Sequence, residues 1–178
     1  MKTPPDTEFI VDFITGRSVP NIGAEENRQA VERFLVEEKG YARDDIAVDA
    51  PIELEIAGEV YRSRIDLTVR AAGGIFMCIK CAPGSLGSRE REIVAAARLL
   101  APYQVPWAVV SDGKTALVID TVSGKTTAEG LDAIPSRDDA LERMAGMPLE
   151  PFPDERRHRE GLIFRSYDAM NVNRAAVG

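Results

Sequence analysis

The sequence predicts an α/β protein with a mixed central sheet flanked by helices. A helix with one apolar face is followed by three strand-like segments joined by tight turns, and a second helix precedes two further strands. The 178 residues, of which 44% are hydrophobic and 29% charged, suit one domain with a real core. We therefore expect a single domain with a helical extension at its C-terminal end.

The predicted α/β domain covers residues 23–146 and has a segment on either side. Residues 1–22 look extended and form an N-terminal arm. Residues 147–178 contain a proline-rich linker and a charged helix from Glu155 to Met170. An apolar patch at 162–164 suits docking of that helix on the body or on a protein partner.

The first helix is predicted from Ala24 to Lys39. Its apolar residues recur at the helical period, and Gly40 supplies the left-handed conformation that ends many helices. Glu25 and Glu26 stand at its start, where negative charge complements the positive end of the helix dipole. That role alone would explain both glutamates.

Three strand patterns follow this helix. Residues 46–60 alternate apolar with acidic residues and are mostly strand, and residues 61–70 continue the alternation. Gly73 and Gly74 make a hairpin turn into residues 75–81. This third segment is apolar on both faces, as is typical of a strand in the centre of a sheet.

Two charged residues on the second and third strands form a candidate pair. Asp66 is the one acid among arginines and a threonine on its face of the second strand. Lys80 shares a face with Phe76 and Cys78 on the third, where a buried ammonium needs a partner. Asp66 across the hairpin is the natural one. A structural ion pair and part of a catalytic site would give the same pattern.

The second half of the chain predicts further elements in a regular order. A helix over 89–100 precedes a short buried strand over 107–111. A hairpin turn at Asp112-Gly113 leads to a strand over 116–120, and 126–127 suit an edge strand. A capping box starts a helix over 137–145.

The net charge of −7 bears on partners. A domain that holds nucleic acid by neutralising phosphates is usually basic, so DNA binding is expected to be weak. No apolar run approaches the length that spans a bilayer, and the N-terminal residues lack a signal-peptide pattern. We therefore expect a cytoplasmic protein with no membrane association.

The two cysteines, Cys78 and Cys81, are spaced as C-x-x-C. One such pair supplies half of a four-ligand zinc site, and the single His158 does not complete it. A redox C-x-x-C normally opens a helix, whereas this pair lies at the end of a strand. Two thiols without metal or redox chemistry are the simpler expectation.

Several short motifs occur in an order and at a spacing that resemble one family. They are Glu25–Gln29, Lys39–Tyr41, Arg64–Leu67, Ile79–Pro83 and Val109–Gly113. Over residues 24–120 the chain resembles the N-terminal nuclease-like domain of type I restriction enzyme R proteins. That family belongs to the PD-(D/E)xK superfamily, so the resemblance implies a restriction-endonuclease-like core.

The resemblance also implies Mg²⁺-dependent DNA cleavage and a role for each matching residue. Asp66 would bind the metal, together with an acid two residues before the lysine. Lys80 would orient the attacking water, and Glu25 would support the site. Mg²⁺ prefers oxygen ligands, and the ion and lysine would stabilise charge on the phosphate.

The chain departs from this family pattern at two positions. Cys78 stands where the second acid is expected, and a thiol is a poor Mg²⁺ ligand. Ile93 stands at the position of a glutamine on the next helix. Glutamates on neighbouring elements are candidate replacements for the missing acid. They are Glu53 and Glu55 on the first strand and Glu90 and Glu92 on the second helix.

The sequence therefore predicts a nuclease-like domain with an impaired metal site, associated with nucleic acid but weakly catalytic or inactive. Two alternatives stay open. One is an active Mg²⁺-dependent DNA endonuclease with a relocated glutamate. The other is a protein-interaction module without catalysis, with residues 155–170 as its contact segment.

Overall fold

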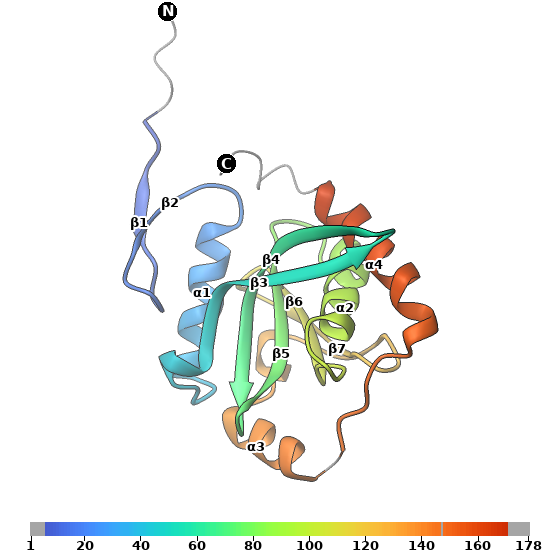
Figure 1. Cartoon of the computed structure of the whole chain (residues 1–178). Helices are drawn as coiled ribbons and strands as arrows, with labels where there is room; N and C mark the ends of the chain where they lie inside the picture. The colour runs from blue at the N-terminus through green and yellow to red at the C-terminus, as the bar shows by residue number, and fades with distance from the viewer. Residues whose placement is uncertain (1–5, 147, 171–178) are drawn as a thin grey trace, which may run out of the picture.

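A six-stranded sheet forms the centre of the protein in the computed structural model, which describes residues 6–146 and 148–170 (Figure 1). The strands lie in the order β3-β4-β5-β6-β7-β8. Only β5 and β6 pair in parallel among the described strands, because α2 crosses over between them. The strands are β3 Ile46–Ile56, β4 Glu59–Ala71, β5 Gly74–Cys81, β6 Trp107–Ser111, β7 Ala116–Asp120 and β8 Lys125–Glu129. The mixed α/β fold is confirmed.

Two helices cover each face of the sheet. On one face, α1 (Glu25–Glu37) and α3 (Arg137–Gly146) pack on a core that includes Leu67 and Ile79. On the other, α2 (Glu90–Leu99) and α4 (Asp154–Ala169) pack on a core that includes Cys78. A short hairpin of β1 (Phe9–Val11) and β2 (Ser18–Pro20) lies beside α1 (Figure 1).

The β3–β4 hairpin is tighter than the alternation pattern indicated. The predicted strand over 46–60 ends at Ile56, and β4 begins at Glu59. Ala57 and Gly58 both have positive φ, at 53° and 79°, as a two-residue hairpin turn requires. The long β3–β4 ribbon then extends towards α4.

A β-bulge in β5 changes which side chains share a face. The register shifts between Val69 and Arg70, so Leu67 pairs with Ile79 and Val69 with Met77. Phe76 consequently packs in the core of α1 and α3, opposite to Cys78. The expectation that Phe76, Cys78 and Lys80 share one face was therefore wrong for Phe76.

The C-terminal helix docks on the body. Phe164 is buried against α2, and Leu162 and Ile163 pack on the same core. A Cβ at Gly161 would lie 3.3 Å from the Ile56 side chain, so α4 approaches β3 closely. Of the two expected docking surfaces, the body or a protein partner, the apolar patch at 162–164 thus packs on the body.

Parts of the predicted flanking segments, at residues 1–5, 147 and 171–178, lie outside the described residues. In the part of the chain that the structure describes, no helix has the length and apolar character needed to span a membrane.

Candidate functional site

Asp66 and Lys80 lie opposite each other on the neighbouring strands β4 and β5. The pairing of Leu67 with Ile79 in antiparallel register sets this arrangement. Lys80 Nζ is 3.7 Å from Asp66 Oδ2, and the backbone N–H of Cys81 donates to the same oxygen at 2.9 Å. The ion pair expected across the hairpin is present.

Glu92 gives Lys80 a second carboxylate partner. This residue lies in the first turn of α2, and its Oε1 is 3.3 Å from Lys80 Nζ. Arg89 approaches the other oxygen of Glu92 at 3.8 Å. The side chains of Lys80 and Glu92 are 9% and 3% exposed, so the contact is largely removed from water. The Lys80 ammonium therefore bridges β5, β4 and α2.

The other proposed replacement acids have different partners. Glu53 accepts a hydrogen bond from Arg62 on the solvent-exposed side of the β3–β4 ribbon. Glu55 is exposed farther along β3. The hydroxyl of Thr126 donates to Glu90 at 3.3 Å. Of the four candidates, Glu92 is the one for which the structure gives a contact with Lys80.

Cys78 is fully buried in the core beneath α2. Burial raises the pKa of its thiol well above the ordinary range, so the thiol stays protonated. The position where the family resemblance implies an acid therefore holds a neutral group. Cys81 is also a buried free thiol with a raised pKa. Neither cysteine offers the accessible thiolate that redox chemistry requires.

Glu25 is part of a hydrogen-bonded network at the start of α1. Its Oε1 accepts hydrogen bonds from Arg28 Nε at 3.0 Å, Arg28 Nη2 at 2.7 Å and Gln29 Nε2 at 3.0 Å. The side chain also lines the same cavity as Asp66 and Lys80. These contacts explain locally why glutamate, arginine and glutamine occur at this spacing in one helical turn.

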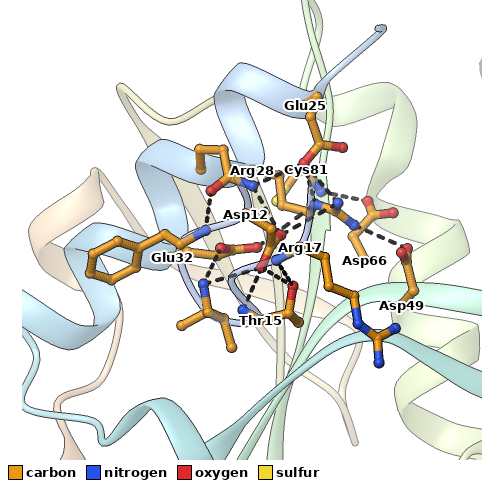
Figure 2. Close-up of polar contacts among 12 residues, drawn as sticks. Asp12, Thr15, Arg17, Glu25, Arg28, Glu32, Asp49, Asp66 and Cys81 are labelled. Carbon is orange, nitrogen blue, oxygen red and sulfur yellow. Dashed lines mark hydrogen bonds and ion pairs between the residues drawn. The ribbon is translucent and has the colours of Figure 1, made fainter. Parts of the chain in front are cut away.

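Arg28 joins three parts of the chain (Figure 2). Besides Glu25, its guanidinium lies 3.7 Å from Asp12 of the β1–β2 hairpin, 3.8 Å from Glu32 of α1 and 3.0 Å from Asp49 of β3. Such a buried cation is tolerated because several carboxylates surround it. The Arg28 cluster, defined as these five residues, fixes the hairpin against α1 and β3.

Two acids of the Arg28 cluster are almost completely buried. Burial and the neighbouring Asp12 raise the pKa of Glu32 to about 8, although Arg28 opposes the shift. Burial alone would raise the pKa of Asp12 too, but hydrogen bonds from Thr15 and Gln29 lower it. One acid of the pair is therefore held charged and the other is biased towards its neutral form.

Sequence reasoning missed Asp12, Glu32 and Asp49. Asp12 is a lone acid in an apolar segment, and Glu32 follows Val31 on the buried stripe of the first helix, so both carried a detectable signal. No sequence signal pointed to Asp49, because the position of its side chain depends on a backbone φ of 53° within β3.

A cavity of about 350 Å³ opens beside Asp66 and Lys80. Cations line it from three elements and the loop before α2, and apolar side chains line it from the N-terminal segment. The cations are Arg28, Arg64, Lys80 and Arg89, and the acids are Glu25, Asp49 and Asp66. This mixture suits a ligand that carries limited negative charge.

The acids near Lys80 do not fit a resident Mg²⁺ as they lie. Asp66 and Glu92 both contact the lysine ammonium, which already supplies the positive charge between them. Cys78 contributes a neutral thiol where an oxygen ligand would be needed. Within residues 6–146 and 148–170, no three histidine, cysteine or acidic side chains are grouped so that they could hold a metal ion.

Comparison with known proteins gave one family match. The model of the type I restriction enzyme R protein N terminus matches residues 23–135. The match spans α1 through β8 and leaves out the β1–β2 hairpin, α3 and α4. Searches of curated proteins and of solved structures found no match.

Proposed function

The chain belongs to the family of type I restriction enzyme R protein N termini, and from this premise we propose that it is a nucleic-acid-binding member with an impaired metal site. Its core is proposed to be restriction-endonuclease-like, of the PD-(D/E)xK type. The element order α1, β3–β4–β5, α2 and β6 supports that assignment, because it brings Asp66 and Lys80 together on paired strands.

The observation that carries the proposed loss of catalysis is the chemical state of position 78. Its thiol is buried and protonated, and the space between the remaining acids holds the Lys80 ammonium. A metal-dependent nuclease needs a bound metal ion and an activated water next to the scissile phosphate. The donor set present supports phosphate binding better than phosphate hydrolysis.

Arg64 supports a role in binding phosphate. It lines the cavity beside Asp66, is exposed, and has no ion pair with a carboxylate of the described residues. Arg28 and Lys80, by contrast, are each surrounded by acids. Because the net charge is −7, binding through so few cations is expected to be weak and strongly dependent on salt.

Fluorescence anisotropy with labelled DNA tests the binding role. Arg64→Gln is expected to weaken binding several-fold at low salt. Arg62→Gln is the matched control, because Arg62 lies on the same strand and pairs with Glu53 at the exposed ribbon. Equal binding by both variants, or no salt-dependent binding by the wild type, would remove the proposal and favour a protein-interaction role.

A second candidate function is an active Mg²⁺-dependent endonuclease in which Glu92 replaces the missing acid. One specific observation favours it, namely the 3.3 Å contact between Glu92 and Lys80. Plasmid cleavage with Mg²⁺ or Mn²⁺ discriminates the two. Cleavage by the wild type that is lost in both Asp66→Asn and Glu92→Gln supports the endonuclease. Cleavage no greater than that of Asp66→Asn supports the binding role alone.

A further inference from the structure

The cavity beside Asp66 has a wall that the matched family region does not supply. Val19, Pro20 and Ile22 line it, and all three precede residue 23, where the family match begins. They come from β2 and the turn into α1, in the segment beside α1 (Figure 1). The N-terminal segment therefore shapes the cavity as well as packing on the domain.

The Arg28 cluster holds this wall in place. Asp12 lies in the turn region between β1 and β2 and accepts hydrogen bonds from the backbone N–H groups of Ile14 and Thr15. Gln29 of α1 donates to Asp12 at 3.0 Å and accepts from the N–H of Phe13 at 2.7 Å. Hydrogen bonds between the hairpin and α1 thus fix the position of the segment that forms this wall of the cavity.

The lining of the cavity combines two chemistries. The cations Arg64, Lys80 and Arg89 line it together with Asp66. The N-terminal segment adds the apolar residues Val19, Pro20 and Ile22, and the Ile22 side chain is 56% exposed and therefore accessible to a ligand. A ligand that contacts both parts of the lining must combine an anionic group with an apolar or planar one.

The size and charge of the cavity further limit which ligands can bind. A volume of about 350 Å³ lies at the lower end of the range for small-molecule sites, roughly 300–1,000 Å³. Glu25, Asp49 and Asp66 also line it and offset most of the charge of the four cations, so the lining suits one phosphate group better than a polyphosphate. A single phosphate carried by one flat heterocycle meets both limits.

We propose that this cavity binds one nucleoside monophosphate unit, with the phosphate against Arg64 and the base against Val19, Pro20 and Ile22. This inference rests on the proposed binding function and gives it a substrate class. The unit has two sources with the same chemistry, a free nucleotide or a nucleotide of a single strand. A base paired and stacked in a duplex cannot enter the cavity without leaving the stack.

Isothermal titration with deoxyadenosine monophosphate, deoxyadenosine and inorganic phosphate tests the proposal. The monophosphate is expected to bind at least about tenfold more tightly than either part, because it contacts both the cationic and the apolar residues of the lining. Arg64→Gln should weaken the monophosphate and inorganic phosphate alike. Ile22→Ser should weaken the monophosphate about three- to tenfold and leave inorganic phosphate unchanged.

Val11→Ser is the matched control for Ile22→Ser, since Val11 is an exposed aliphatic residue of the same N-terminal segment and does not line the cavity. Both substitutions are at exposed positions, so folding should be retained and is checked by circular dichroism. Equal effects of the two variants would overturn the inference. So would a monophosphate that binds no better than inorganic phosphate.

A single-stranded and a duplex oligonucleotide of the same sequence separate this inference from the proposed function. If the protein prefers the single strand and Ile22→Ser reduces that preference, the inference is supported, and the bound unit is a nucleotide of a single strand. Binding of the monophosphate without the strand supports it with a free nucleotide as the source. Salt-dependent duplex binding that Arg64→Gln weakens and Ile22→Ser does not, with no monophosphate binding, overturns the inference and leaves the proposed function standing.

Discussion

Glu92 Oε1 lies 3.3 Å from Lys80 Nζ, and this contact links the first turn of α2 to the last part of β5. Asp66 on β4 contacts the same ammonium at 3.7 Å. Without the lysine the two carboxylates would repel each other, because little water reaches Glu92 to screen the charges. Lys80 therefore has a structural role that does not depend on catalysis.

The first prediction concerns removal of that ammonium. Lys80→Met should destabilise the protein by about 3 kcal/mol or more, since it removes the ammonium that lies between two largely buried carboxylates. Millimolar Mg²⁺ should recover part of this loss, because the ion then replaces the lysine charge between Asp66 and Glu92. Urea unfolding with and without Mg²⁺ measures both effects.

Arg62→Met is the control for this measurement, because the Arg62–Glu53 pair is largely exposed. An exposed pair contributes about 0–1 kcal/mol, so the variant should unfold nearly as the wild type does and show no response to Mg²⁺. A Lys80→Met protein as stable as the wild type would contradict a structural role for the lysine.

The second prediction concerns Cys78→Glu, which restores the family pattern in sequence. The Cys78 side chain is fully buried in the α2 core, so a glutamate there should cost about 3 kcal/mol or more. Cys78→Ala has no charge to bury and should cost less. Thermal unfolding of the two variants measures the difference. A stable Cys78→Glu variant with metal-dependent cleavage would instead indicate a nuclease scaffold that lost one ligand.

The meeting of Asp66 and Lys80 shows what could be predicted from the sequence and what could not. The alternation patterns and the glycine turn placed the two residues on paired strands. The turn itself is formed by Ala72 and Gly73, with φ of 50° and 80°. If the strands paired regularly from that turn, Asp66 would lie opposite Ile79, and the Lys80 side chain would point to the other face of the sheet. The bulge in β5 shifts the register by one residue and brings Lys80 opposite Asp66.

Contacts between distant segments were harder to predict than local elements. Arg28 was part of a recognised motif, yet its pairs with Asp12 and Asp49 depend on how the hairpin and β3 pack on α1. Periodicity identifies the buried face of an element but not its neighbour. Glu92 was named as one of four replacements, and only packing of α2 on β5 distinguished it.

The third prediction concerns the β1–β2 hairpin. Asp12→Ala removes the acceptor for Ile14, Thr15 and Gln29, so docking of the hairpin should weaken by about 1–3 kcal/mol. Arg17 is exposed in this hairpin and provides a site for trypsin. Cleavage after Arg17, followed by mass spectrometry, should accelerate while the rest of the domain stays resistant. Asp6→Ala is the control. If trypsin cleaved both variants at the same rate, the prediction that Asp12 holds the hairpin on the domain would be contradicted.

The fourth prediction concerns pH and follows from Glu32. Its pKa in the folded protein is about 8, above the ordinary value of 4.5 that applies to the unfolded chain. Between these values the folded state holds a proton that the unfolded state has released, so stability should fall as pH rises through this window. Glu32→Gln keeps an acceptor for the N–H of Ile14 but cannot ionise.

Urea unfolding from pH 5 to pH 9 should therefore show a smaller loss of stability with rising pH in Glu32→Gln than in the wild type. The groups that face Glu32 include Arg28, Asp12, the Ile14 N–H and the Cys81 thiol. Asp12, whose pKa is lowered, is already charged across the range, and burial raises the pKa of the Cys81 thiol well above its usual value. Glu26→Gln, at an exposed position of the same helix, should keep the wild-type slope. If Glu32→Gln also kept it, the buried glutamate would not be the group that titrates, and the pH dependence would have to arise outside the Arg28 cluster.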